Sequence, residues 1–304
     1  MATIAGWTIA VSGASGFVGS ALVASLREQG AIVKRLVRSA PRDPQADILW
    51  NPAAPLDPIA LEGLDAVVHL AGESIAGLRW TAGKKARIRE SRVLGTRHLA
   101  TGLAQCAKRP RALVCASAIG YYGDRGDEVL REDSPSGSGF LAHVCREWEA
   151  ATQPARDAGI RVVHLRFGMV ASPTGRALKQ MLLPFKLGLG GRLGSGRQYM
   201  SWISLDDAVG AIEHALITDS LAGPVNAVAP DSITNAEFTK TLGEALHRPT
   251  IFPVPEFALR MMLGEMGEEV LLASQRVQPA RLMASGYKFR HPVLKKALEE
   301  MLKH

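Results

Sequence analysis

The sequence lacks several features that would mark a disulfide-rich, zinc-binding, secreted or membrane-spanning protein. It contains three cysteines, Cys106, Cys115 and Cys145, with no CxxC pair, which is typical of a reducing compartment rather than a disulfide scaffold or structural zinc site. It has no HExxH motif, and aromatic residues make up 6% of the chain. No apolar run approaches the roughly 18 residues of a membrane span, and no basic residue precedes the first apolar stretch as in a signal peptide. We therefore expect a cytoplasmic protein without a bound metal or a membrane partner.

Acidic residues are scarce in one segment, residues 79–111. It holds ten Lys or Arg residues against one acid, Glu90, whereas the whole chain carries a net charge of +7. Nucleic-acid binding would require stacking aromatic residues or a known motif beside this charge, and the segment offers Trp80 alone. We interpret the segment as a solvated helix face near an anionic ligand, and expect no nucleic-acid partner.

Short apolar runs alternate with amphipathic stretches in the first half of the chain. The predicted strands are 7–12, 32–37, 66–70, 112–115 and 162–167, and the predicted helices include 81–108 and 140–158. Strands that alternate with helices of this length predict right-handed crossovers and an α/β fold with a doubly wound parallel sheet of the Rossmann type.

After Gly168 the pattern changes. A glycine-rich loop at 188–196 is followed by the stretch 202–214 and by helical patterns at 256–272 and 294–302. We predict a nucleotide-binding domain over residues 1–170, to which a segment near 202–229 returns. Residues 171–304 would form a smaller C-terminal substrate lobe over the carboxyl ends of the strands, where open α/β sheets bind ligands.

The strongest local motif follows the first predicted strand. It reads Gly13-Ala14-Ser15-Gly16-Phe17-Val18-Gly19. Glycines there permit a tight turn and a close approach of the backbone to a pyrophosphate, which then lies at the helix N-terminus. The motif opens a βαβ unit, so we predict a dinucleotide site formed by Gly13, Ser15, Gly16, Phe17, Val18 and Gly19.

The end of the second predicted strand discriminates NAD from NADP. NAD sites usually place a carboxylate there, whereas this chain has Arg35, Arg38 and Ser39, and no acid before Asp43. We predict NADP(H), with Arg38 as the main contact to the 2′-phosphate and Ser39 or Arg35 assisting. The alternative is that Arg38 is a surface arginine without a ligand.

Further runs along the chain resemble a known family. They are Leu70-Ala71-Gly72-Glu73, Ser117 to Asp124, and Trp202-Ile203 before Asp206-Asp207. With the glycine motif, they are similar to the extended short-chain dehydrogenase/reductases. Over almost its whole length the chain resembles more closely an atypical subgroup of bacterial and mitochondrial NAD-dependent epimerase/dehydratases. The resemblance implies cofactor contacts from Leu70, Ala71 and Gly72, and from Ser117, Cys145, Arg166, Phe167 and Gly168.

The catalytic positions depart from the superfamily pattern. Active members carry a Tyr and a Lys four residues apart, and the resemblance puts these positions at Leu141 and Cys145. The upstream serine aligns at Ser117 or Ala118, and the usual asparagine is replaced by Arg92. The resemblance thus implies a redesigned site, with Cys145 near the nicotinamide ribose.

The residue pattern itself draws attention to Arg92. Ile88, Arg92, Gly95 and Leu99 recur at the spacing of a buried helix stripe, so Arg92 should point inward. A buried arginine needs a carboxylate, backbone carbonyls or a ligand phosphate, and the alternative to a site role is a structural ion pair.

A proton donor must come from another residue. Tyr121 and Tyr122 follow the fifth strand at its carboxyl end, so either phenol could act as the acid while Ser117 orients a carbonyl oxygen. The alternative is that both tyrosines are packing residues.

The predicted substrate residues are Glu73, Arg192, Arg197 and Trp202. The loop 188–197 corresponds to the region that grips the nucleotide in sugar-nucleotide enzymes, and its two arginines would suit an anionic group. Met200 stands where the relatives have an arginine, however, and a mobile surface loop is the alternative. We expect an NADP(H)-dependent oxidoreductase or epimerase that acts on a small or nucleotide-linked compound, as a monomer or homodimer. A catalytically silent NADP(H)-responsive sensor or scaffold is the rival hypothesis.

Overall fold

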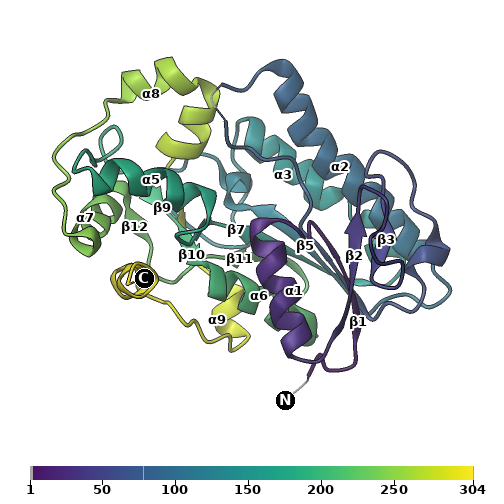
Figure 1. Cartoon of the computed structure of the whole chain (residues 1–304). Coiled ribbons are helices and arrows are strands. Elements are labelled where there is room, and N and C mark those ends of the chain that lie inside the picture. Colours follow the sequence, from purple (N-terminus) through teal and green to yellow (C-terminus); the bar gives the residue numbers. More distant parts are fainter. Residues whose placement is uncertain (1–2, 78, 304) are drawn as a thin grey trace.

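The computed structural model describes residues 3–77 and 79–303. Within these residues, seven parallel strands form the central sheet: β1 (Thr8–Ser12), β2 (Ile32–Val37), β3 (Asp47–Leu49), β4 (Ala66–His69), β5 (Ala112–Ala118), β7 (Arg161–Phe167) and β11 (Gly223–Ala227). Their order across the sheet is β11-β7-β5-β4-β1-β2-β3 (Figure 1). The prediction of a parallel, Rossmann-type sheet is confirmed. The strand order reverses between β1 and β4, which is where such sheets bind ligands.

Helices cover both faces of the sheet. They are α1 (Phe17–Glu28), α2 (Ala82–Gln105), α3 (Phe140–Ala150), α4 (Gln153–Asp157) and α6 (Leu205–Ile217). On one face, Leu22 of α1 and Ile212 of α6 pack with Val114 of β5. On the other face, Leu99 and Leu103 of α2 pack beneath α4 in a second apolar cluster. Burial of these helix stripes on the two sides of the sheet produces the three-layer architecture.

The remaining elements build a second lobe. They are β8 (Met169–Ala171), α5 (Arg176–Lys186), β9 (Tyr199–Met200), β10 (Trp202–Ser204), β12 (Ile233–Thr234), α7 (Asn235–Leu246), α8 (Glu256–Leu263), a π-helical turn (Gly267–Leu272), β13 (Arg276–Val277), α9 (Ala280–Ala284) and α10 (Leu294–Met301). The lobe has an apolar cluster of its own, in which Leu178, Phe238 and Leu298 are buried. Short elements after β3 and β5 complete the chain: the 3-10 helices Pro58–Leu61 and Ile119–Tyr122, and β6 (Val129–Leu130), which pairs with β13.

Two predicted helices differ from those observed. The stretch predicted at 140–158 divides into α3 and α4, and Pro154 lies in the first turn of α4. The stretch predicted at 256–272 ends as α8 at Leu263, because Gly264 adopts a φ of 56° that stops a regular helix.

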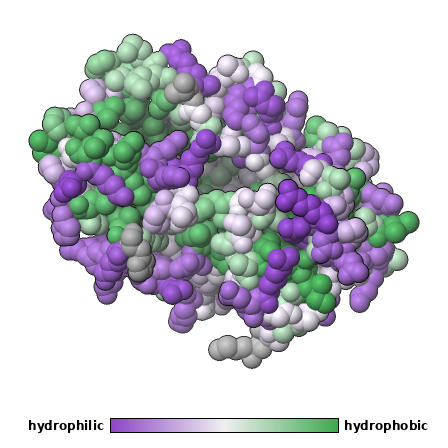
Figure 2. Space-filling model, in the orientation of Figure 1, coloured by the Kyte–Doolittle hydropathy of each residue, from purple (hydrophilic) through white to green (hydrophobic). Residues whose placement is uncertain are grey.

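The two parts of the chain face each other across a cleft. Figure 2 shows a hollow near the middle of this face, bordered mainly by hydrophilic residues. Figure 1 places α8 and α5 on one side of it, and α2, α3 and α1 on the other. In the described residues, no helix is both long and apolar enough to cross a membrane.

Candidate functional site

The glycine motif forms a tight turn between β1 and α1. Gly13 has a φ of 68°, and a Cβ at this position would lie 2.9 Å from the carbonyl carbon of Leu70. A Cβ at Gly19 would overlap the Gly13 carbonyl oxygen. Gly16, the N-cap of α1, brings no side-chain hydrogen bond to the helix terminus, and the first turn has no acidic residue. The free N–H groups and the helix dipole therefore suit the pyrophosphate of a dinucleotide.

A buried chain of polar side chains supports the neighbouring loop. Ser12 Oγ accepts hydrogen bonds from the backbone N–H groups of Leu70 and Ala71 at 3.1 and 3.2 Å. The same oxygen lies 2.6 Å from His69 Nδ1, and His69 Nε2 lies 3.0 Å from Thr96 Oγ1. Burial lowers the pKa of His69 to about 4, so the ring is neutral at physiological pH. These contacts hold Leu70–Gly72 against the glycine turn.

The arginines at the end of β2 have different roles. Arg35 Nε donates to Asp47 Oδ1 at 2.7 Å, so Arg35 is engaged in an ion pair and does not assist at the cofactor site as predicted. Arg38 and Ser39 are exposed, and Arg38 forms no ion pair within the described residues. The free cation at this strand end fits the 2′-phosphate of NADP better than a ribose diol.

A buried ionic network lies behind β5. Ser117 Oγ donates to Glu149 Oε1 at 2.7 Å, and Arg166 binds both carboxylate oxygens of Glu149 at 2.8 and 2.9 Å. The guanidinium of Arg166 also donates to the Tyr122 hydroxyl at 2.9 Å. That hydroxyl donates in turn to Asn226 Oδ1 at 2.7 Å. Burial raises the pKa of Tyr122 to about 12, although Arg166 opposes this effect.

This network differs from the expectation that the hydroxyls of Ser117 and Tyr122 are free. Tyr122 is fully buried and Ser117 is 3% exposed, so neither hydroxyl reaches a substrate. Arg166 is 2% exposed and neutralises Glu149, so its side chain is structural, and the predicted cofactor contact stays a prediction. Tyr121 is only partly buried, with its ring 3.5 Å from the Arg166 guanidinium carbon. Of the two predicted acids, Tyr121 is therefore the one that remains accessible.

Cys145 is packed beneath the same strand. It is 3% exposed, and its thiol points at the carbonyl of Ala118 at 3.7 Å. Burial, together with the charge of Glu149, raises the pKa of Cys145 to about 12. The thiol therefore stays protonated and enclosed, which contradicts the prediction of a catalytic or cofactor-contacting role.

Arg92 points toward the cofactor edge, as its helix spacing predicts. Its Nη1 donates to the carbonyls of Glu73 and Ile88 at 2.9 and 3.0 Å. The guanidinium lies 5.0 Å from the Trp148 ring and approaches Gly72, where a Cβ would be 3.3 Å from it. Within the part of the chain that the structure describes, its Nε and Nη2 have no hydrogen-bond partner. Arg92 thus uses the two N–H donors of Nη1 on backbone carbonyls and keeps the three donors of Nε and Nη2.

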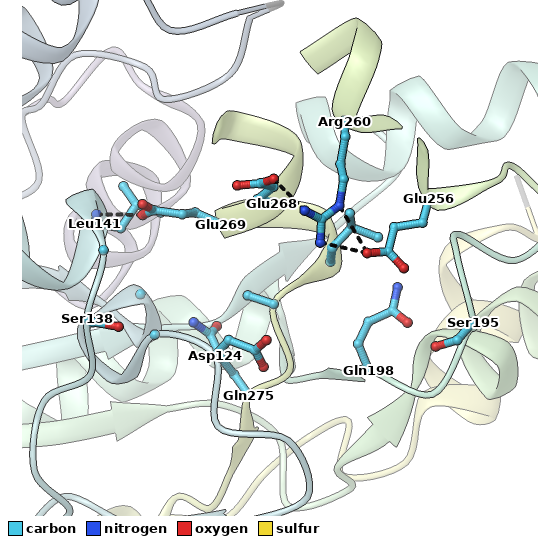
Figure 3. Close-up of a pocket in the computed structure, with 15 residues that line it drawn as sticks. Asp124, Ser138, Leu141, Ser195, Gln198, Glu256, Arg260, Glu268, Glu269 and Gln275 are labelled. Carbon is cyan, nitrogen blue, oxygen red and sulfur yellow. Dashed lines mark hydrogen bonds and ion pairs between the residues drawn. The ribbon is translucent and has the colours of Figure 1, made fainter. Parts of the chain in front are cut away.

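A cavity of about 350 Å³ lies beyond β5, between α3 and the second lobe (Figure 3). Its wall includes Gly120, Gly123 and Asp124 after β5, Leu141 at the start of α3, and Glu256, Arg260, Glu268, Glu269 and Gln275 from the second lobe. Glu269 accepts hydrogen bonds from the backbone N–H groups of Phe140 and Leu141, both at 2.7 Å. The second lobe thereby caps α3 and closes one side of the cavity.

The predicted substrate residues do not meet in this cavity. Trp202 is fully buried in the second lobe, where its indole N–H donates to the Asp231 carbonyl. Glu73 pairs with Lys84 at 2.7 Å, and this contact lowers the pKa of the carboxyl. Arg192 and Arg197 are exposed, and their loop contributes Ser195 and Gln198 to the cavity instead. None of the four residues lines this cavity, and their assignment to a substrate stays a prediction.

The sequence analysis missed Asp124, Gln198, Gln275 and the glutamates of the second lobe. Asp124 ends the run that begins at Ser117, and Gln275 follows the π-helical turn, so position along the chain was the only signal. Phe167 and Gly168 do end β7 at the ligand edge of the sheet. Among residues 3–77 and 79–303, no group of His, Cys, Asp and Glu is arranged to hold a metal ion.

Two family models match separate parts of the chain. The model of the NAD-dependent epimerase/dehydratase family matches residues 9–227, and a domain of unknown function, DUF1731, matches residues 254–301. Epimerase family protein Mb2239 of Mycobacterium bovis is 45% identical over 291 residues, which cover 95% of this chain and 96% of that protein.

Two solved structures illustrate near and distant similarity. The human epimerase family protein SDR39U1 (isoform 2), solved with NADPH, is 36% identical and has a TM-score of 0.88, covering 97% of this chain and 98% of that chain. MoeE5 in complex with UDP-glucose and NAD is 20% identical with a TM-score of 0.76 and covers 97% of each chain. The second of these shares the fold alone.

Proposed function

Because the chain belongs to the NAD-dependent epimerase/dehydratase family, we propose that it binds NADP(H) at the carboxyl edge of its sheet. In this proposal, it transfers a hydride between the nicotinamide and a small substrate in the cavity beyond β5. The observation that carries the cofactor choice is Arg38, an exposed arginine without an ion pair among the described residues, at the strand end where NAD-binding proteins place a carboxylate.

The surroundings of Arg38 support NADP(H) over NAD(H). Asp47, the acidic residue paired with β2 in the sheet, is 1% exposed in its side chain and binds Arg35, so it cannot accept from a ribose hydroxyl. Lys84 and Arg87 lie around Glu73 nearby and add positive charge to this side of the cleft. A relative that is 36% identical was crystallised with NADPH.

We assign the chemistry on the substrate to Arg92 and Tyr121, which are not in the wall of the cavity, so in this proposal the substrate extends from the cavity toward them. The bound nicotinamide supplies or accepts the hydride, and a substrate carbonyl that gains a hydride develops negative charge on oxygen. The unpaired Nε and Nη2 of Arg92 can stabilise that charge. Tyr121 can supply the proton, because its phenol is the one that the buried network leaves accessible.

Dissociation constants for NADPH and NADH, measured by fluorescence, test the cofactor assignment. Arg38→Ala should weaken NADPH binding about tenfold or more, since a charge-assisted contact is lost, and should leave NADH binding nearly unchanged. Arg27→Ala, an exposed arginine at the other end of α1, is the matched control. Equal affinities for both nucleotides, with no effect of Arg38→Ala, would reject NADP(H).

One observation favours a second function, that of an NADP(H)-responsive sensor without turnover. Leu141 and Cys145 occupy the two positions of the usual catalytic pair, and the Cys145 thiol is buried and protonated. Absorbance of bound NADPH during addition of fractionated cell metabolites separates the two functions. Oxidation by one fraction that is lost in Tyr121→Phe supports the enzyme. No oxidation and no isomerised product from any fraction, despite tight NADPH binding, supports the sensor.

A further inference from the structure

The wall of the cavity beyond β5 is rich in hydrogen-bond acceptors. Asp124, Glu256, Glu268 and Glu269 contribute carboxylates, and one cation, Arg260, lines it with them. That cation is already neutralised: Arg260 donates to Glu256 Oε1 at 2.7 Å and to Glu268 Oε1 at 2.8 Å (Figure 3). A phosphate entering the cavity would therefore meet net negative charge and no free guanidinium among the lining residues.

Two buried amides also face the cavity. Gln198 is 7% exposed and uses its Nε2 on the carbonyls of Leu193 and Leu271, so its carbonyl oxygen remains as an acceptor. Gln275 is 9% exposed, and its side-chain amide has no hydrogen-bond partner among the described residues. Its amide atoms are not sealed from solvent, so they are free to bind a ligand that enters the cavity.

The backbone around Gln275 is held rigidly. Its N–H donates to the Tyr199 carbonyl at 3.2 Å, and its carbonyl accepts from Ser201 Oγ at 2.7 Å. The neighbouring Ser274 N–H donates to Asp124 Oδ1 at 3.0 Å, which leaves Asp124 Oδ2 for the cavity. The amide and the carboxylate are thus prepositioned at one wall.

We propose that this cavity binds a small, donor-rich substrate without negative charge, a polyhydroxylated or amino-substituted alcohol or carbonyl compound, and rejects nucleoside-diphosphate sugars. Gln275 and Asp124 are the residues that select it. The proposal rests on the proposed function for the place of the substrate, but the selectivity follows from the wall itself. Arg192 and Arg197, which would hold a diphosphate, are exposed and do not line the cavity.

Ligand-observed NMR on the NADPH-loaded protein tests this selectivity with probes that share a hexose ring and differ in charge. The probes are glucosamine, glucose and glucose 6-phosphate, with UDP-glucose as a fourth. We expect glucosamine and glucose to bind more tightly than glucose 6-phosphate by about tenfold, and UDP-glucose not to compete with them. Tighter binding of either phosphorylated probe would overturn the proposal, as would binding of none of the four.

Substitutions in the cavity wall test which residues bind the probes. Gln275→Leu should weaken glucosamine and glucose about equally, by roughly tenfold, whereas Asp124→Asn should weaken glucosamine selectively. Gln278→Leu, three residues further along and outside the cavity wall, is the matched control for Gln275. Unchanged binding in both Gln275→Leu and Asp124→Asn would refute the assignment. The same titrations on cofactor-free protein show whether a loss of probe binding comes from the cavity wall or from a failure of the protein to bind NADPH.

Discussion

Ser117 Oγ lies 2.7 Å from Glu149 Oε1, and this contact links the carboxyl end of β5 to α3 below it. Both carboxylate oxygens of Glu149 also accept hydrogen bonds from the Arg166 guanidinium. The polar groups of Ser117, Glu149 and Arg166 therefore pair with one another inside the protein. The serine that the family pattern would assign to the substrate is thereby committed to the protein interior. In the proposed function, the catalytic surface therefore lies toward Arg92 and Tyr121.

Glu149→Gln should destabilise the fold by about 3 kcal/mol or more, because it leaves the Arg166 cation buried without a counter-charge. Glu147→Gln, two residues earlier, is the control: its ion pair with Arg89 is far more exposed and should contribute less than about 1 kcal/mol. Urea unfolding measures both. Equal stability losses in the two variants would contradict the role given to the buried pair.

Stability should fall with acid below pH 6.5 through two buried histidines. Burial lowers the pKa values of His69 and His164 to about 4, below 6.5 in the unfolded chain. Between these pH values the unfolded state binds more protons, so the free energy of unfolding falls by about 1.4 kcal/mol per pH unit for each histidine. Their contribution is fully present above pH 6.5 and is lost as the pH falls through 4.

Unfolding measured from pH 7 to pH 4 checks this dependence. His69→Gln should reduce stability at pH 7. Between pH 6.5 and pH 4 its free energy of unfolding should fall by about 1.4 kcal/mol per pH unit less than that of the wild type, because one proton fewer is bound on unfolding. An unaltered slope in His69→Gln would show that His69 does not titrate as its burial requires.

Substitution of the two adjacent tyrosines should have different effects: the change at Tyr122 should lower stability, and the change at Tyr121 should lower turnover. Tyr122→Phe should cost about 1–3 kcal/mol, because the buried Asn226 oxygen loses its donor and Arg166 loses an acceptor. Tyr121→Phe should leave stability nearly unchanged and reduce NADPH oxidation about a hundredfold or more, since it removes the accessible phenol. Thermal unfolding and turnover on the same samples test the pair. Full activity in Tyr121→Phe would eliminate it as the acid.

Gly19→Ala should abolish NADPH binding, since the added methyl overlaps the Gly13 carbonyl and forces the turn open. Gly83→Ala, at the start of α2, provides the comparison because its Cβ would meet Arg87 at an ordinary 3.7 Å. Fluorescence titration with NADPH distinguishes the two variants. Wild-type affinity in Gly19→Ala would place the dinucleotide elsewhere.

The sequence by itself determined the parallel sheet, the glycine turn and the inward direction of Arg92. These features depend on local spacing: alternating apolar runs and helices, a motif of seven residues, and a helix stripe. Each can be inferred from neighbours within a few turns of chain.

Only the tertiary structure decided which polar groups are free to act. Ser117 donates a hydrogen bond to the carboxylate of Glu149, 32 residues away in the sequence. Tyr122 donates one to the side-chain amide of Asn226, 104 residues away. The cavity joins Asp124 after β5 to Gln275 after the π-helical turn. A hydroxyl or amide has the same chemistry wherever it stands in the chain, and its availability depends on partners that meet it only when the second lobe packs over the sheet.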